Sequence, residues 1–226
     1  FGAAYLGPSY TPFNVPGDPN EAKSEVRNLS PPNEMADRLD DRLTLLRSID
    51  QLRRDADQSG MMASLDKFNQ KAFSLLTSDK ARNAFDLSQE SDQLRDRYGR
   101  HAWGQRALLA RRLVEAGASF VTMVMENPYQ SGIKYLPDGV YNWDSHAVNC
   151  HLFHDALARL PIYDRAVTAL VEDLYERGLD KKVLLIVTGE FGRTPRISEA
   201  KGRPGRDHWP SAMSMLVAGA GMQTGQ

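Results

Sequence analysis

Residues 182–188 read Lys-Val-Leu-Leu-Ile-Val-Thr and form the clearest strand pattern in the sequence. The run is apolar on both faces, which is typical of a central parallel strand covered by helices. Residues 119–125 and 213–218 are two further β-rich runs, and Pro161 fits the first turn of a helix that ends at Gly178. The order of strand, helix, strand, loop and strand predicts an α/β fold with a mostly parallel central sheet.

The part of the chain before this pattern differs in character. Residues 1–35 are rich in Pro, Gly, Asn and Ser and predict an irregular segment, either a linker or a loop on the substrate side. Residues 36–116 carry apolar residues at helical spacing, with a short helix expected at 79–85 and a longer one at 102–116. We interpret them as a helical insertion without site residues, followed by residues 117–226 as part of the α/β metal-site domain.

Composition and charge exclude several classes of protein. The chain has 226 residues, of which 41% are hydrophobic and 25% charged, the profile of an ordinary globular protein. The net charge of -1 gives no electrostatic reason to expect a nucleic-acid partner or an anionic membrane. No stretch approaches ~18 consecutive apolar residues, so we expect no transmembrane segment. The single cysteine, Cys150, excludes an internal disulfide.

Three short clusters combine carboxylates or imidazoles with glycines and aromatic residues. They are Asn-Trp-Asp-Ser-His at 142–146, Gly-Glu-Phe-Gly-Arg at 189–193 and Gly-Arg-Asp-His-Trp at 205–209. Taken singly, each is more often a turn or a cap than a site. Each nevertheless lies on a predicted loop beside a predicted strand, and sites in open α/β sheets gather at the carboxyl ends of the strands. We therefore expect the three clusters to meet at one rim.

The clusters supply five candidate metal ligands, namely Asp144, His146, Glu190, Asp207 and His208. A mixed set of carboxylates and imidazoles favours zinc or manganese, whereas an all-oxygen set suits calcium or magnesium better. Calcium is therefore the weaker candidate. A divalent ion held in this way lowers the pKa of a bound water molecule and neutralises an anionic ester.

Two arginines of the same clusters, Arg193 and Arg206, are suited to holding the oxygens of phosphate or sulfate in a forked geometry. Arg193 is the residue that we expect to act in catalysis. The remaining histidines have a plainer interpretation. His151 and His154 flank a helix start and are expected to be structural or at the surface, and His101 is expected on a helix face.

The second and third clusters extend to Gly-Glu-Phe-Gly-Arg-Thr-Pro at 189–195 and Gly-Arg-Asp-His-Trp-Pro at 205–210. In this order, after Trp-Asp-Ser-His, they resemble a bacterial family of sulfatase-like proteins of unknown function, placed in the alkaline phosphatase superfamily. The resemblance covers nearly the whole chain. It implies a mostly parallel central sheet flanked by helices, with metal ligands on loops at the strand ends. The residues that match those ligands are Asp144, His146, Glu190 and His208, with Asp207 adjacent.

The sequence departs from the superfamily's pattern in three places. Glu190 is followed by Phe191, where superfamily phosphatases commonly carry a histidine, so one imidazole of a two-metal site is missing. Cys150 is not followed by the Pro and Arg of formylglycine sulfatases. The superfamily's nucleophile comes from an N-terminal strand, so we expect it upstream of Phe1 and expect the fold to be incomplete at both ends.

The resemblance implies a metal-dependent hydrolase of phosphate or sulfate esters. Its substrate would be a small anionic ester or a sulfated or phosphorylated glycan. Export to the periplasm or the exterior is expected from the resemblance alone. A non-catalytic metal- or ligand-binding protein on the same fold is the alternative, and a structural α/β domain whose motifs are turns is a third hypothesis. Metal content separates the third hypothesis from the other two.

Overall fold

The computed structural model describes residues 4–6, 10–21, 41, 79–129, 133–223 and 225. By its contacts the chain divides into two compact units, one of Phe1–Gly17 with Glu25–Asp86 and the other of Asp18–Ser24 with Leu87–Gln226. The described part of the first unit holds the 3-10 helix η1 (Ala4–Leu6) and the helix α4 (Asp79–Phe85), which confirms the short helix expected there. The helical spacing expected between 36 and 78 lies largely outside the described residues, and the three-part division of the chain stays a prediction.

The second unit contains all the candidate site residues, and helices form its body. After the 3-10 helix η3 (Leu87–Gln89) come α5 (Asp92–Tyr98), α6 (Ala102–Glu115) and α7 (Leu152–Glu176). The extent of α6 confirms the helix expected at 102–116. His101 caps this helix, because its Nδ1 accepts a hydrogen bond from the backbone N–H of Gly104 at 3.1 Å.

The start of α7 differs from the prediction. Pro161 was expected in the first turn, but the helix begins at Leu152 and Pro161 lies inside it. A proline inside a helix removes one backbone hydrogen bond. The helix continues through it because its later turns pack on α5 and α6, so tertiary contacts override the local signal. The additional turns place His151 at the N-cap position and bring Asp155 and Arg159 onto the helix.

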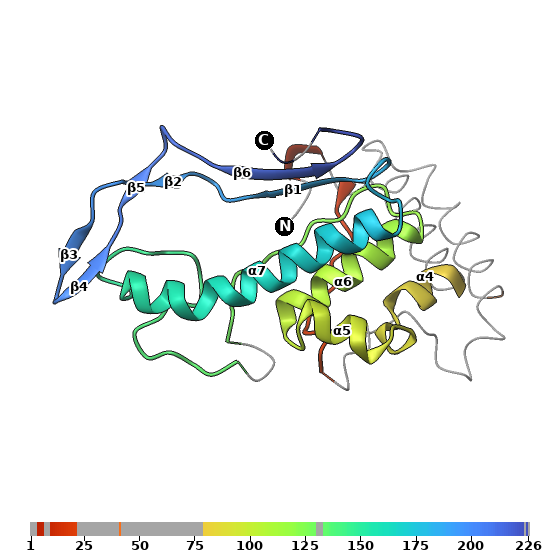
Figure 1. The fold of residues 1–226 in the computed structure, drawn as a ribbon, viewed down its shortest axis with the longest axis horizontal. Coiled ribbons are helices and arrows are strands. Elements are labelled where there is room, and N and C mark those ends of the chain that lie inside the picture. Colours follow the sequence, from red (N-terminus) through yellow and green to blue (C-terminus); the bar gives the residue numbers. More distant parts are fainter. Residues whose placement is uncertain are drawn as a thin grey trace, which may run out of the picture. The chain divides into compact units, whose positions relative to one another are not determined.

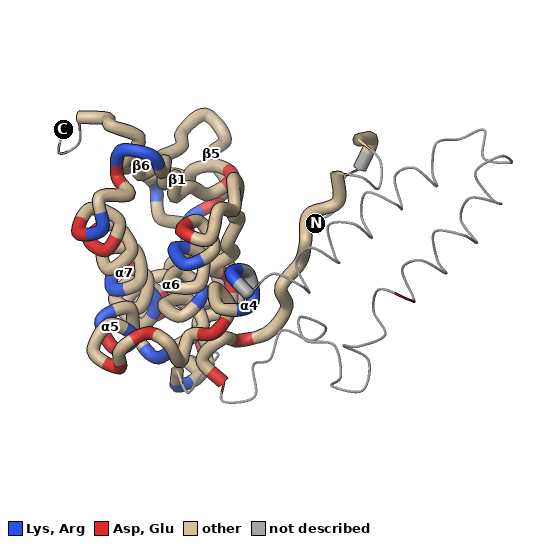
Figure 2. Tube along the Cα trace, turned by 90° about the vertical axis from the view of Figure 1, so that its right-hand side faces the viewer, with Lys and Arg blue, Asp and Glu red and all other residues tan. Residues whose placement is uncertain are grey.

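The core of this unit lies among the three helices, which pack side by side (Figure 1). Trp103 of α6 and Ala166 of α7 are buried together, with Ile162 and Tyr163 of α7 packed against them. Figure 2 shows basic and acidic residues mixed over α5, α6 and α7, and some of them, such as Arg111 and Asp173, are buried as an ion pair. The charges of the helical layer are therefore largely paired and do not form a binding face of one sign.

The strands form one long antiparallel ribbon that folds back on itself (Figure 1). The strands β1 (Leu184–Thr188), β2 (Gly192–Arg193) and β3 (Ser198–Ala200) run out, and β4 (Arg203–Gly205), β5 (His208–Trp209) and β6 (Met215–Gly219) return. They pair as β1 with β6, β2 with β5 and β3 with β4. At the tip, Lys201 and Gly202 have φ of 53° and 71°, as a two-residue hairpin turn with positive φ at both positions requires.

The ribbon corrects the predicted fold class. An alkaline phosphatase-like α/β fold with a mostly parallel central sheet flanked by helices is wrong for the described residues, whose sheets are two-stranded and antiparallel. Residues 119–125, expected to be a strand, have no regular secondary structure. A parallel pair needs a long crossover, usually a helix. Residues 189–214 instead contain only short strands among glycines and prolines, so β6 returns directly beside β1.

The ribbon is interrupted twice, and both interruptions fall at candidate site residues. Between the β2/β5 and β3/β4 pairs, residues 194–197 on one strand face only 206–207 on the other. Between the β1/β6 and β2/β5 pairs, residues 189–191 face 210–214. Such bulges change the direction in which neighbouring side chains point and are common beside active sites. The pair β2/β5, which carries Arg193 opposite His208, is held between them.

A buried ion pair of α7 fixes the loop that leads into the first cluster. Arg159, 1% exposed, places Nε 3.0 Å from Oδ2 of Asp155. Its guanidinium also donates to three backbone carbonyls, those of Glu126 at 3.1 Å, Asn142 at 3.1 Å and Val140. Asp155 accepts a hydrogen bond from the backbone N–H of Val140 at 3.0 Å. Two segments of the loop are thereby tied to one helix turn.

Replacing Arg159 by methionine should destabilise the fold strongly. The substitution Arg159→Met retains most of the side-chain volume but leaves the Asp155 carboxylate buried without its cation, which typically costs about 3–5 kcal/mol. The free energy of unfolding, measured by chemical denaturation, should fall by that amount. Lys182→Met, at an exposed cation, is the matched control and should change it by less than about 0.5 kcal/mol. Equal stability of the two variants would contradict this role of Arg159.

Candidate metal centre

The first cluster is anchored by Trp143. Its ring stacks on Trp103 of α6, with centroids 5.7 Å apart and an interplanar angle of 20°. The guanidinium carbon of Arg159 lies 4.5 Å from the centre of the same ring, within cation–π range. The indole N–H donates to the backbone carbonyl of Met125. These contacts join Trp143 to the helical layer and so determine where the next residue, Asp144, is placed.

The ribbon docks directly on this loop. The backbone N–H of Arg206 donates to the carbonyl of Ser145 at 2.9 Å. The Arg193 guanidinium donates to the carbonyls of Arg206 at 3.1 Å and Trp143 at 3.2 Å, so it bridges the ribbon and the loop. Gly205 is buried, and a Cβ added there would lie only 2.0 Å from the backbone nitrogen of Ala147. Only a glycine permits this close approach of the two backbones.

Docking brings three of the five predicted ligands together. One ligand atom from each of Asp144, His146 and His208 lies within 4.8 Å of the other two. The rings of His146 and His208 have centroids 4.6 Å apart, and the centroid of the Phe191 ring lies 4.5 Å from that of His208. Two histidines and one carboxylate from residues far apart in the sequence thus form one group at the junction of loop and ribbon.

Charge is concentrated around Asp144. One carboxylate oxygen, Oδ1, pairs with Nδ1 of His146 and lies 3.3 Å from the Arg193 guanidinium, and the other accepts from the side chain of Asn149. Burial alone raises the pKa of Asp144, but the hydrogen bond and charge of His146 and the charge of Arg193 outweigh it. The pKa of Asp144 therefore lies below its ordinary value, and the carboxylate is ionised at neutral pH.

The same contacts show which nitrogen of His146 faces Asp144. Nδ1 of His146 pairs with the Asp144 carboxylate, which only accepts hydrogen bonds. An ion shared by the two side chains would take the place of the proton between them. The Nη1 atom of Arg193 also lies 3.2 Å from this Nδ1. A guanidinium only donates hydrogen bonds, so the shared Asp144 carboxylate is the group that holds Arg193 and His146 together.

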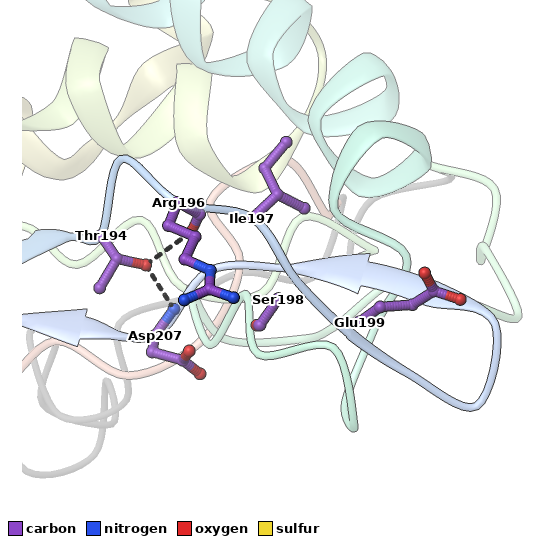
Figure 3. A pocket seen from close by; sticks show the side chains of 6 residues that line it. All are labelled: Thr194, Arg196, Ile197, Ser198, Glu199 and Asp207. Carbon is purple, nitrogen blue, oxygen red and sulfur yellow. Dashed lines mark hydrogen bonds between the residues drawn. The ribbon is translucent and has the colours of Figure 1, made fainter.

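The other two predicted ligands lie elsewhere. Glu190 is exposed at the bend between β1 and β2 and is not part of the group. Asp207 lines a separate hollow of ≈ 460 Å³ beside Thr194, Arg196 and Ser198 (Figure 3). There the Thr194 hydroxyl accepts from the backbone N–H of Asp207 at 3.1 Å and donates to the carbonyl of Arg196 at 2.9 Å. Thr194 thereby bridges the two strands of the ribbon within the bulge formed by residues 194–197 and 206–207.

The two predicted anion-binding arginines have backbone partners. Arg206 donates to the carbonyls of Thr194 and Arg193, the second at 2.9 Å. Arg193 is engaged with the loop as described above and only partly exposed, so the geometry assigns it the positioning of Asp144 and His146. Its expected catalytic role toward an anion stays a prediction.

A second group of ligand-type side chains was not foreseen. One ligand atom each from Asp138, His151 and His154 also lies within 4.8 Å of the other two. The two histidines were expected to be structural or at the surface. The available signal was their spacing, because residues three apart lie on one face of a helix.

Comparison with known proteins shows the family. The sequence model described as "Protein of unknown function (DUF1501)" matches residues 1–226, and the chain belongs to this family. No curated protein and no solved structure matches the chain. The predicted membership of the sulfatase-like group in the alkaline phosphatase superfamily is therefore corrected. The family match carries no link to that superfamily, and the antiparallel ribbon differs from its parallel sheet.

The described helices also bear on the membrane prediction. None of them combines the length and the apolar character needed to cross a bilayer, which confirms for this part of the chain that a transmembrane helix is absent. Even α7, with 25 residues, has acidic and basic side chains along its length.

Inserting a methyl group between ribbon and loop should weaken metal binding. In Gly205→Ala the new Cβ would overlap the backbone of Ala147, so the loop carrying His146 must move away from the strand end carrying His208. We expect zinc affinity, measured by calorimetry, to fall by about 10–100-fold, the size of effect seen when supports of metal ligands are lost. Gly189→Ala, where a Cβ meets no atom within 4 Å, should bind zinc as the unmodified protein does. Unchanged affinity in Gly205→Ala would show that this contact does not position the ligands.

Proposed function

We propose that this protein is a metal-dependent hydrolase of phosphate or sulfate esters, with its ion held by Asp144, His146 and His208. The observation that carries the proposal is the convergence of these three side chains within 4.8 Å. They come from a loop and a strand that are sixty or so residues apart in sequence and are joined by specific backbone contacts. Chance neighbours on a surface do not require such support.

The ligand set favours zinc, with manganese second. Two imidazoles and one carboxylate are the protein ligands of many catalytic zinc sites, which keep a further position open for water or substrate. Calcium, the weaker candidate, prefers oxygen ligands and is disfavoured by the two imidazoles. His208 is exposed and the other two side chains are partly exposed, so an ester in solution has access to the open position.

The chemistry follows from this arrangement. A bound divalent ion lowers the pKa of its water molecule and draws charge from the oxygens of an anionic ester. With the ion held by Asp144, His146 and His208, the site would supply an activated water molecule for hydrolysis of the ester to the oxyanion and the free alcohol. Arg193 contributes by holding Asp144 and His146 beside each other. A small anionic ester or a sulfated or phosphorylated glycan would suit the site.

A non-catalytic metal-binding protein is the second candidate. The hydroxyls nearest in sequence to the cluster residues are engaged with backbone carbonyls, as Ser145 is with Trp143 at 3.5 Å and Thr194 is with Arg196 at 2.9 Å. Neither of these two hydroxyls is therefore favoured as a nucleophile, and in the hydrolase the attacking group would be metal-bound water or another group of the chain. Turnover distinguishes the two candidates, because only the hydrolase consumes an ester.

Removing one ligand should abolish both binding and turnover. Asp144→Asn keeps the shape of the side chain but loses its charge, and His208→Gln loses an imidazole. We expect each to lower zinc affinity by at least ~10–100-fold and to remove zinc-dependent hydrolysis of an aryl phosphate or an aryl sulfate, assayed in separate arms. Asp164→Asn, at an exposed carboxylate of α7, is the matched control and should retain both properties.

The two readouts separate the candidates. Zinc binding that depends on Asp144 and His208 without any turnover of either ester would support the non-catalytic metal-binding protein and exclude the hydrolase. Zinc binding that is the same in all three variants would refute the site itself. The relative rates with the two aryl esters would identify the oxyanion that the site prefers.

A further inference from the structure

The loop that carries Asp144 and His146 has a second group of ligand-type side chains at its base. Asp138 precedes the loop's tip, and His151 and His154 follow it at the start of α7. This group shares no residue with the centre described above. It is formed by neighbouring segments rather than by docking of the ribbon, so it depends on different contacts.

Backbone and side chains both shape this group. The backbone N–H of His151 donates to the carbonyl of Asp138 at 2.8 Å, which closes the loop at its base. The His154 ring lies face to face with the His151 ring, with centroids 3.6 Å apart and an angle of 10°. Nδ1 of His154 is 2.6 Å from Oδ2 of Asp138. Three ligand-type groups are thus held together at one point.

His151 also caps α7, because its Nδ1 accepts a hydrogen bond from the backbone N–H of His154 at 3.3 Å, but the pairing of His154 with Asp138 adds little stability. The side chain of His154 is 53% exposed and that of Asp138 31%, and an ion pair at such exposure contributes little. Neutral imidazole and ionised carboxylate are the forms that bind divalent metals.

We propose that Asp138, His151 and His154 form a second site for a zinc-type divalent cation. Two imidazoles and one carboxylate select zinc over calcium or magnesium, and water completes the coordination. The exposed His154 ring can rotate out of the stack to direct a nitrogen at the ion. A cation here connects Asp138 to α7 across the base of the loop. It therefore restrains the segment that presents Asp144 and His146 to the ribbon.

Zinc content after reconstitution and dialysis tests the second site directly. The unmodified protein should retain about two zinc ions per chain, one for each group. The paired variant Asp138→Asn with His154→Gln should retain about one. These two side chains are partly exposed and the replacements are close in size, so the fold should persist, which far-UV circular dichroism checks.

A complementary variant separates this proposal from the proposed function. Asp144→Asn with His208→Gln should also retain about one zinc ion, and zinc should raise its melting temperature. Adding the changes at Asp138 and His154 should remove both effects. Retention of zinc by this variant supports the second site even if the unmodified protein hydrolyses no ester.

Two outcomes would overturn the second site. One is an unchanged zinc content in the Asp138→Asn with His154→Gln variant. The other is complete loss of zinc from the Asp144→Asn with His208→Gln variant, which would assign all bound metal to the first group. A purely structural role for the histidine stack would produce the first outcome, together with a lower melting temperature that does not depend on zinc.

Discussion

The buried pair of Arg159 and Asp155 is the constraint on which the second unit's site depends. A guanidinium and a carboxylate removed from water are stable only when both are paired and hydrogen-bonded. Here their partners are backbone groups of the loop that precedes the first cluster, including the N–H and carbonyl of Val140. The helix thereby determines the path of a loop with no regular secondary structure. The face of Arg159 then stacks on Trp143 and sets the position of Asp144.

The antiparallel ribbon completes what the loop begins. The extra residues of its two bulges lie on opposite strands, so the shifts in register that they cause cancel. The short pair β2/β5 between the bulges therefore has a register of its own, while β1 and β6 stay paired. That pair places Arg193 and His208 opposite each other, and the guanidinium of Arg193 then reaches the loop. Site residues on a short strand pair between bulges are held by backbone hydrogen bonds, yet they point in directions that a regular ribbon would not allow.

Local features of the sequence predicted local structure well. The extent of α6 and the strand core at 184–188 follow from apolar spacing, and the clusters correctly indicated that Asp144, His146 and His208 meet. Strand direction was not predictable from a short apolar run, since such a run suits either pairing. The turn at Lys201 and Gly202, flanked by short strands with no helix between, was the missed signal.

One expected ligand lies apart from the others for a reason of tertiary structure. Glu190 was assigned as a strand-end ligand because a parallel sheet was assumed, whereas the bulge after β1 leaves it exposed.

Anomalous diffraction from crystals grown with zinc, measured at the zinc absorption edge, tests the central claim most directly. The proposed centre predicts an ion about 2.0–2.2 Å from nitrogens of His146 and His208 and from an oxygen of Asp144. An anomalous map with no ion between these residues, at a zinc concentration that saturates binding, would contradict it.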